Sequence, residues 1–591
     1  MAQAVIIVVM KQVYRLLSTL YRRPEWIWLP LLAIGFFLLA ASYNYTTQDA
    51  GFVKWISPDE NANYLFAKQY AENGTLMFWE KYNLLGQGIV MPRSFRSDGA
   101  LLKPVSFLGL PIIYGTIAKG LGAAALPYIT PVLAAIGLIF FFLLVARLFD
   151  RRVAAVATVI LAFFPVYIYF SSHSFFHNVP FVVFFLIGLY LALRFSDYPD
   201  FSQTGRSRPY LGWLLSAVSG VFIGLAVATR TSELLWLAPL FIVLWLFNLR
   251  RVGLVKLIFF LFFAVVAYSP VFFWNQVLYN SPLASGYPNM DKSVSAIVST
   301  GRAAVASVVK APVTIAQNRV EAGDYLEKLN SAIFVFGFRP DHSFKMSYYY
   351  FWKMFPWLII MTVLGFACWL ANWRRRRFGQ LIYILCLLII APILIFYYGS
   401  WIFYDNPDPN SFTIGNSYTR YWLPLYLGMI PLAAYAIVCA AKLGYKPAIR
   451  SALRWSTVAI IAAWSIFFVY YGSDEGLAYS ASRQLASRQE WKSVLDLTPA
   501  NSVIVTRYQD KLFFPQRMVI VGLLTDINMN NIYAKLAARI PVYYYNFKLS
   551  DADLVYLNTR KLKDSDLIIV KIANINETFT LYRLYSRSKT R

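Results

Sequence analysis

Residues 128–170 read YITPVLAAIGLIFFFLLVARLFDRRVAAVATVILAFFPVYIYF, two long apolar runs joined by a short segment that carries three arginines. A helix needs about 20 mainly apolar residues to cross a membrane, and short cytoplasmic loops collect Lys and Arg. The stretch therefore predicts two membrane spans, 128–147 and 153–171, that are joined on the cytoplasmic side.

The composition of the whole chain agrees with this prediction. Of its 591 residues, 58% are hydrophobic and 14% are charged, and the mean hydropathy is +0.51. Such a composition excludes a soluble globular protein and indicates a polytopic membrane protein. The formal net charge of +26 would suggest nucleic acid as a partner of a soluble protein. Here membrane topology explains the basic residues, and we expect no nucleic-acid partner.

Nine further apolar runs predict spans, and the basic residues orient all eleven. The further runs are 25–43, 178–195, 212–229, 232–247, 255–274, 350–372, 379–398, 421–441 and 455–471. With a cytoplasmic N-terminus, every dense basic cluster falls in a cytoplasmic loop. These clusters are Arg22/Arg23, Arg147/Arg151/Arg152, Arg194/Arg206/Arg208, Arg250/Arg251/Lys256, Arg374 to Arg377, and Lys442/Lys446/Arg450/Arg454.

The same rule decides one doubtful segment, 105–121, which is apolar enough to span. Counting it as a span would move all later basic clusters to the outside, so we predict a helix that lies at the outer surface. The fold class is thus a polytopic α-helical membrane protein of about 11 transmembrane helices. Residues 1–471 form its membrane module, with outer loops 44–127, 275–349 and 399–420.

Residues 472–591 are too polar to span and long enough to fold alone, which predicts an extracytoplasmic C-terminal domain. Five runs in it have the composition of strands, and a helical pattern lies near 528–539 between the second and third. The domain is therefore expected to be α/β. The runs are SVIVTRY (502–508), MVIVGLL (518–524), IPVYYYNF (540–547), DLIIVKI (566–572) and TFTLYRLY (578–585).

Two adjacent carboxylates follow the first span, in the stretch SPDE at residues 57–60. Ser57 and Glu60 have the spacing of a capping box, in which the carboxylate of Glu60 reaches back to the backbone of Ser57. That structural interpretation leaves Asp59 unexplained and free for chemistry. At this point both interpretations remain open.

Other ionisable residues are predicted at the same outer ends of spans. Such groups are costly near a membrane unless they are paired or face a cavity. Fixed cations beside a free carboxylate are typical of a site that binds an anion and contains a general base. The residues are Lys103, His173, His177, Arg230 and Arg420.

The ordered set SPDE, LLKP, FDRR, GLAVATR and TRYWLPLY, within residues 25–441, resembles the GT-C membrane glycosyltransferases. The branch it resembles contains protein O-mannosyltransferases and aminoarabinose (lipid A) transferases, and the C-terminal domain has no counterpart in this resemblance. The resemblance implies a GT-C bundle that transfers a sugar from a polyprenyl-phosphate donor to an acceptor hydroxyl, with inversion, on the extracytoplasmic face. The acceptor would be a lipid, a glycan or a protein.

The resemblance also implies roles for individual residues. Asp59 would be the general base and Glu60 would orient or assist it. Lys103, Arg230 and Arg420 would bind the donor phosphate. A polyprenyl chain needs an apolar groove between helices, and the 47 Phe, 41 Tyr and 17 Trp residues can supply one.

The metal dependence of such an enzyme stays open in the sequence. Some GT-C enzymes hold a divalent ion with a second carboxylate in the next outer loop, where this chain has SSHSFFHNVP instead. His173 and His177 would share one face of a helix and could bind a metal ion. Alternatively, they hydrogen-bond backbone groups and the enzyme needs no cofactor. Further substrate contacts are expected from Tyr287, Tyr418 and Asn178.

Two other classes of protein compete with the glycosyltransferase. A transporter or lipid flippase usually places ionisable residues near the middle of the bilayer, whereas the predicted spans here are nearly free of Asp and Glu. An O-antigen ligase or polymerase uses lipid-linked glycans on the same face but relies on Arg and His of outer loops. In either class, loss of Asp59 would leave the activity largely intact.

Overall fold

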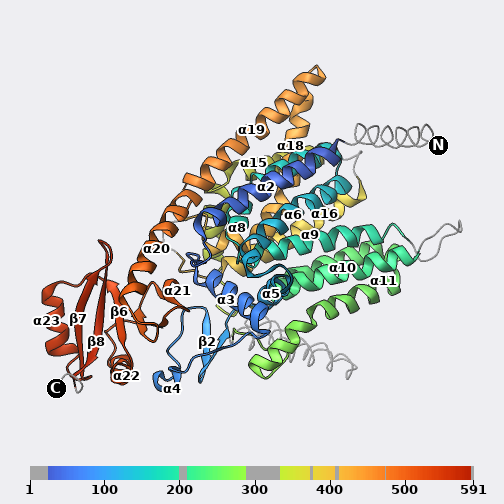
Figure 1. Cartoon of the computed structure of the whole chain (residues 1–591). Helices are drawn as coiled ribbons and strands as arrows, with labels where there is room; N and C mark the ends of the chain where they lie inside the picture. Colours follow the sequence, from blue (N-terminus) through green and yellow to red (C-terminus); the bar gives the residue numbers. More distant parts are fainter. Residues whose placement is uncertain are drawn as a thin grey trace, which may run out of the picture.

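The computed structural model describes residues 24–198, 209–287, 330, 333–372, 377–405, 412–472 and 474–587. It is a helical bundle with a C-terminal sheet domain at one end (Figure 1). Several predicted features fall outside the described residues, namely Arg22, Arg23, Arg206, Arg208, Arg374 to Arg376 and most of the loop 275–349.

The predicted eleven spans agree with the helices. Among the described residues, nine helices are long and apolar enough to cross a membrane, and two sharply bent pairs raise the number to eleven. The single-helix spans are α2 (Glu25–Thr47), α6 (Leu126–Leu148), α9 (Asn178–Phe195), α10 (Pro209–Thr229), α11 (Leu234–Tyr279, which contains two spans), α16 (Phe378–Gly399), α18 (Leu423–Ala440) and α19 (Pro447–Tyr471). The bent pairs are α7 (Arg151–Ala162) with α8 (Pro165–Ser172), and α14 (Pro340–Ser347) with its π-helical continuation η3 (Tyr348–Lys353) and α15 (Pro356–Ala371).

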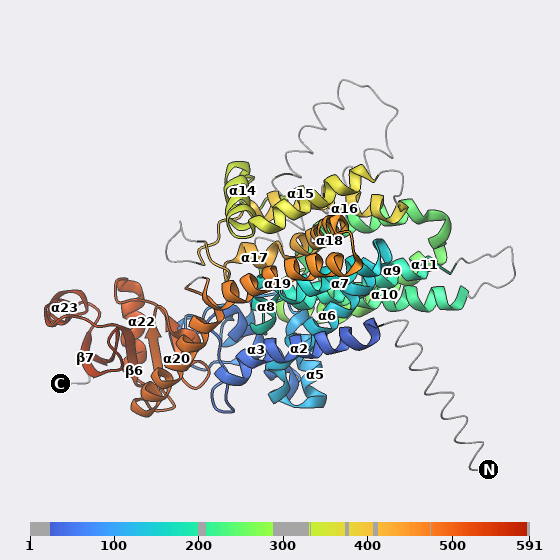
Figure 2. The same ribbon diagram turned by 90° about the horizontal axis from the view of Figure 1, so that it is seen from above.

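Local sequence explains the bends. Pro165 and Pro356 each stand at the first turn of the helix that follows the bend, where a missing N–H costs nothing. The two pairs bend by 52° and 91°. Helix α11 breaks into its two spans between Asn248 and Gly253, and Gly253 has φ 67°, a conformation that glycine adopts easily. The bends bring the ends of α8 and of η3 toward the same end of the bundle as the sheet domain (Figures 1 and 2).

The first long loop forms a small layer at that end of the bundle. It contains α3 (Pro58–Asn73), β1 (Phe78–Trp79), α4 (Asn83–Gly86), β2 (Phe95–Asp98), β3 (Leu101–Pro104), α5 (Gly109–Leu121) and the short turn η1 (Ala123–Ala125). The three strands pair in the order β1-β3-β2, all antiparallel. The segment 105–121 is therefore a helix of 13 residues that packs against α3, rather than a span.

The C-terminal part contains all five predicted strands and the predicted helix. Its elements are α20 (Leu477–Leu497), β4 (Val503–Thr506), α21 (Asp510–Phe513), β5 (Met518–Val521), α22 (Ile527–Ala537), β6 (Val542–Phe547), α23 (Asp551–Tyr556) with η6 (Leu557–Lys561), β7 (Leu567–Asn574) and β8 (Phe579–Ser586). The strands form one mixed sheet in the order β5-β4-β6-β8-β7. Strand β4 is parallel to β5 and β6, and β8 is antiparallel to β6 and β7.

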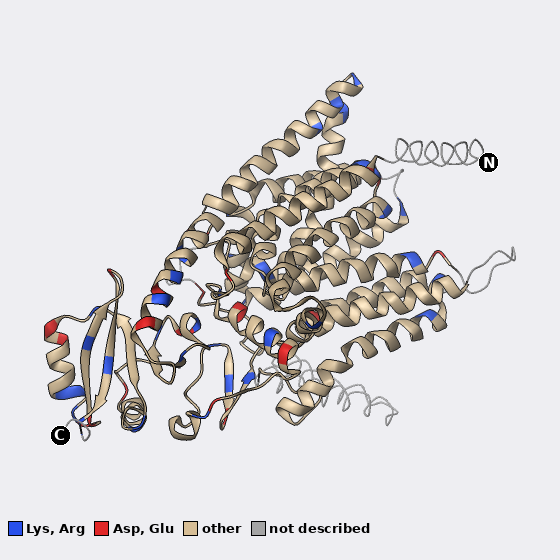
Figure 3. Ribbon diagram, viewed as in Figure 1, with Lys and Arg blue, Asp and Glu red and all other residues tan. Residues whose placement is uncertain are grey.

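Charge is distributed unevenly along the bundle. Lys and Arg gather at the helix ends that lie away from the sheet domain, as the predicted topology requires (Figure 3). The acidic residues of the membrane part lie mostly at the opposite end, where the first loop and the sheet domain meet the bundle (Figure 3). The candidate site residues are found at this second end.

Candidate active site

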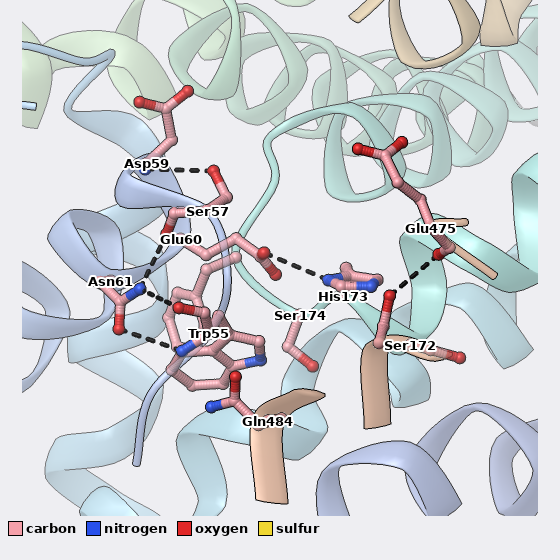
Figure 4. A network of polar contacts seen from close by, with 12 residues as sticks. Trp55, Ser57, Asp59, Glu60, Asn61, Ser172, His173, Ser174, Glu475 and Gln484 are labelled. Carbon is pink, nitrogen blue, oxygen red and sulfur yellow. Dashed lines mark hydrogen bonds and ion pairs between the residues drawn. The ribbon is translucent and has the colours of Figure 1, made fainter. Parts of the chain in front are cut away.

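Asp59 and Glu60 leave the first turn of α3 on different sides (Figure 4). The helix begins as predicted, because the side chain of Ser57 accepts a hydrogen bond from the N–H of Asp59 and Pro58 occupies the first helical position. Gly74 ends the helix with φ 68°. Glu60 points into the protein, and the carboxylate of Asp59 points away from it (Figure 4).

The predicted capping role of Glu60 is wrong. Its side chain is 1% exposed, and Oε2 lies 3.2 Å from Nδ1 of His173. The other oxygen, Oε1, has no hydrogen-bond partner in the described part of the chain. The imidazole of His173 stacks on Tyr169, with ring centroids 4.5 Å apart, and packs on Tyr43. Glu60 therefore ties α3 to the end of α8, because burying its charge is favourable only with a partner.

Asp59 lies at the surface of the site and has two neighbours. Its Oδ1 accepts a hydrogen bond of 2.6 Å from Oγ of Ser94. Its Oδ2 lies 3.8 Å from Nη2 of Arg420, which is longer than a hydrogen bond. The side chain of Asp59 is 45% exposed, whereas that of Arg420 is 11% exposed. A carboxylate with this exposure can meet a substrate.

Arg420 is held in place by its surroundings. It belongs to the short helix α17 (Ser417–Tyr421), and its backbone carbonyl accepts a hydrogen bond of 2.8 Å from Nδ2 of Asn178. The guanidinium donates to Oγ of Ser417 and stacks over the ring of Phe176, 4.5 Å from its centroid. Nε is buried and has no hydrogen-bond partner among the described residues. Arg420 is thus oriented but keeps a free donor.

Arg230 contacts the same aromatic ring as Arg420, that of Tyr421. The ring of Tyr421 is 4.4 Å from the guanidinium carbon of Arg230 and 5.2 Å from that of Arg420. Both distances are within the range of a cation–π interaction. Arg230 is buried and also forms an ion pair of 2.9 Å with Glu233 and a hydrogen bond of 3.0 Å to the hydroxyl of Tyr398. The two cations therefore share one aromatic ring as a neighbour.

Tyr287 and His177 complete the cluster around these residues. Burial raises the pKa of Tyr287, and the nearby carboxylate of Asp59 raises it further, so the phenol stays protonated. Burial lowers the pKa of His177 to about 3, and the positive charge of Arg230 lowers it as well. His177 Nε2 lies 3.3 Å from Oγ of Ser106. His177 is therefore a neutral hydrogen-bonding group.

The two histidines do not form the expected pair. His173 follows the last residue of α8 and His177 precedes the first residue of α9, so they lie in a turn and not on one helix. Each is engaged separately, with Glu60 and with Ser106. In the described ranges, no group of three or more His, Cys, Asp or Glu side chains gathers as a metal site would require. Among the described residues, the side chains around His173 and His177 therefore do not fit a bound metal ion.

Lys103 and Tyr418 lie in networks of their own. Lys103 is on β3, forms an ion pair of 2.5 Å with Asp98 and donates to the carbonyl of Leu278. Tyr418 is buried, and its hydroxyl donates to the carbonyl of Trp401 and lies 2.8 Å from Nε2 of His342. Their predicted contacts with a substrate stay predictions, and the described contacts do not join either side chain to Asp59.

Three residues of the candidate site were not predicted from the sequence, namely Ser94, Ser106 and Tyr421. Tyr421 stands directly after Arg420 in TRYWLP, and an aromatic residue beside a cation was a usable signal. Ser94 and Ser106 lie in loops where nothing in the sequence indicates the direction of the side chain. Only the folded loop brings their hydroxyls to Asp59 and His177.

Comparisons with known proteins agree with the sequence resemblance. Residues 116–274 match the sequence model of the family described as dolichyl-phosphate-mannose-protein mannosyltransferase. The structure is similar to that of the archaeal oligosaccharyltransferase AglB from Archaeoglobus fulgidus, solved with an inhibitory peptide and a dolichol-phosphate. The TM-score is 0.51 at 13% identity, and the match covers 88% of this chain and 69% of that one.

A second similar structure is ArnT from Cupriavidus metallidurans. Its apo form matches with TM-score 0.48 at 13% identity, over 94% of this chain and 98% of that one. Its complex with undecaprenyl phosphate matches with TM-score 0.49 at 12% identity, over 95% and 98%. None of the curated proteins matches the chain significantly. The predicted resemblance to the GT-C glycosyltransferases is confirmed by the family match and the fold.

Proposed function

Because the chain has the fold of a GT-C membrane glycosyltransferase, we propose that it transfers a sugar from a polyprenyl-phosphate donor to a hydroxyl group. The hydroxyl oxygen forms a bond to the anomeric carbon, and the bond from that carbon to the phosphate oxygen breaks with inversion. Asp59 takes the hydroxyl proton, and the polyprenyl phosphate leaves as an anion. The observation that carries this proposal is a half-exposed carboxylate 3.8 Å from an oriented arginine.

Arg420 and Arg230 are suited to the leaving phosphate. A phosphate that is held by cations leaves without protonation, and arginine matches its oxygens with a planar fork of donors. Arg420 offers a buried Nε without a partner. Arg230 is already paired with Glu233 and lies over the ring of Tyr421, so it would contribute mainly its positive charge to the binding of the phosphate. Tyr287 is a protonated phenol near Asp59 and can donate to the sugar or the phosphate.

An apolar cavity beside Arg230 fits the lipid tail of such a donor. It has a volume of about 910 Å³ and lies between α10 and the two halves of α11. Phe107, Ser106 and Ser232 line its end near the site, and Ala238, Phe241 and Ala264 line its length. A polyprenyl chain in this cavity would place its phosphate next to the two arginines, because Thr231 and Ser232 follow Arg230 directly.

The distribution of charge supports an orientation in the membrane. The protein is a multi-pass membrane protein. The basic helix ends opposite the sheet domain support a cytoplasmic N-terminus and an extracytoplasmic site and C-terminal domain (Figure 3). The protein would thus lie in the cell membrane or inner membrane. It would transfer the sugar, a hexose or a pentose, on the extracytoplasmic side to a lipid, glycan or protein acceptor.

The test is the substitution Asp59→Asn in the purified protein. Wild type and variant are incubated with labelled polyprenyl-phosphate sugars and a membrane extract as acceptor, with and without EDTA. We expect the variant to lose at least about 100-fold in transfer, the range of general-base catalysis, and EDTA to change nothing. Asp49→Asn is the matched control, because Asp49 is an equally exposed acid that pairs with Arg488 away from the site.

Equal transfer by wild type and Asp59→Asn would overturn the assignment of the base. A wild-type protein that transfers no sugar from any donor but moves labelled lipid across a vesicle membrane would be a flippase. Transfer that survives Asp59→Asn but is lost in Arg420→Ala would support a ligase-type reaction.

A further inference from the structure

The sheet domain and the first loop share one hydrophobic core. Val90 is 1% exposed and belongs to the same buried cluster as Ile520 and Tyr533 of the sheet domain. Val90 and Met91 also form backbone bridges with Ile520, at the edge strand β5 of the sheet. The segment after α4 is therefore built into the C-terminal domain, although more than four hundred residues separate the two in the sequence.

An ion pair with a buried carboxylate follows directly along this segment. Asp510, at the start of α21, is fully buried and accepts three hydrogen bonds from Arg93. The backbone N–H of Arg93 binds Oδ2 at 2.8 Å, and Nε and Nη2 bind Oδ1 at 2.9 and 2.6 Å. Nη2 also donates to the carbonyl of Tyr508. The sheet domain thus holds both the backbone and the side chain of Arg93.

The next residue, Ser94, donates the hydrogen bond to Asp59. Its φ is +64°, a left-handed conformation that is unfavourable for a non-glycine residue. Such a conformation persists only where the surroundings determine it. On one side of Ser94, Asp510 holds Arg93 by hydrogen bonds. On the other side, strand β2 begins at Phe95.

We propose that the C-terminal domain positions the general base, with Asp510 acting through Arg93 and Ser94 on the carboxylate of Asp59. The hydroxyl of Ser94 donates a hydrogen bond to Oδ1 of Asp59. The other oxygen, Oδ2, therefore stays available to face Arg420 and the acceptor. Asp510 is a positioning residue, because its partners are Arg93 and the loop and not a substrate. This inference rests on the proposed function of Asp59.

The first test measures transfer kinetics in Ser94→Ala, Asp510→Asn and the double variant. Alanine is as unfavourable as serine in the backbone conformation at φ +64°, so the substitution removes only the hydroxyl group. We expect each single variant to lower kcat about 10-fold or more with an unchanged KM for the donor, since a misplaced catalytic group is costly and the arginines are untouched. The double variant should be no worse than the poorer single variant, because both act through one hydrogen bond.

Arg488→Gln is the matched control. Arg488 of α20 pairs with Asp49 and joins the same domain to the bundle without contacting the loop of Ser94. It should keep wild-type kcat. A kcat loss in Arg488→Gln as large as in Asp510→Asn, or a double variant in which the two losses multiply, would overturn the inference.

The second test does not depend on activity. Hydrogen exchange should speed up for the segment 90–96 in Asp510→Asn and in Arg93→Lys, while β4 of the sheet keeps its protection. Unchanged exchange in 90–96 would overturn the inference even where wild type transfers sugar. A wild type without transfer would reject the proposed function, and the exchange result would still decide whether Asp510 orders Ser94.

Discussion

The carboxylate of Asp59 and the guanidinium of Arg420 lie 3.8 Å apart, with the carboxylate just after the first span and the guanidinium just before the last two. Neither group satisfies the hydrogen-bonding capacity of the other, because the distance is longer than a hydrogen bond and the side chain of Asp59 stays 45% exposed. In the proposed reaction, the gap between them would have a proton acceptor at one edge and a phosphate-binding group at the other. Both groups would be expected beside a reacting anomeric carbon.

Arg420→Lys should raise the KM for the lipid-phosphate donor at least about 10-fold, because a point charge does not reproduce the planar fork. The lysine would also lose the stacking of the guanidinium over Phe176. The measurement is steady-state transfer at varied donor concentration. Arg488→Gln serves as the control, and an unchanged KM in Arg420→Lys would remove this residue from the donor site.

Ala238→Phe should weaken long-chain donors selectively, because Ala238 lines the apolar cavity between α10 and α11. We expect transfer from an undecaprenyl donor to fall about 10-fold and transfer from a short-chain, farnesyl-length donor to change less than about twofold, since each buried CH₂ contributes about 0.8 kcal/mol. Ala463→Phe on α19 is the control, because Ala463 is exposed and outside that cavity. Equal effects on both chain lengths would exclude the cavity as the binding site of the tail.

Gly109→Ala should reduce both stability and transfer. A Cβ at Gly109 would lie 2.2 Å from the backbone carbonyl of Ala228, and the end of α10 that it displaces leads into Arg230. Overpacking of this kind costs about 1–3 kcal/mol. Gly120→Ala on the same helix meets nothing within 4 Å and should keep or slightly raise the melting temperature. Melting curves in detergent and donor KM values compare the two, and the same effect in both variants would contradict this explanation.

His177 should make the protein sensitive to acid. Its pKa falls from 6.5 to about 3 on folding, so the unfolded chain binds a proton that the folded chain does not. Stability should therefore be lost as pH falls below 6.5, by about 1.4 kcal/mol per pH unit from this residue. His177→Gln should flatten the decline of the melting temperature between pH 7 and pH 5. An identical decline in wild type and variant would show that His177 is not the cause.

The sequence predicted the spans and the strands because each rests on a local pattern. Apolar runs of sufficient length marked the helices, the basic residues excluded 105–121 as a span, and β-branched and aromatic runs marked the five strands. The breaks were harder to predict. Pro165 and Pro356 mark where the two bent pairs break, but the residues around them do not indicate how far each pair bends.

The site was predicted in part for the same reason. Arg230, Arg420, Tyr287 and Asp59 do lie together, since topology alone places the ends of their spans at one end of the bundle. Glu60 was misjudged because its capping partner is near in sequence, whereas its true partner, His173, lies in the turn after α8. The direction of a side chain in a loop, as for Ser94, is a property of the folded loop.

The core that Val90 shares with Ile520 has a consequence for how the protein is made. The first loop leaves the ribosome long before the sheet domain, so Val90 has no apolar surface to pack on until nearly the whole chain has been synthesised and inserted. Domains generally fold from the N-terminus during synthesis, but here the loop that carries Ser94 must wait for the last part of the chain. An unfinished or truncated chain would thus have its membrane helices in place but an incomplete candidate site, which delays the proposed activity until synthesis is nearly finished.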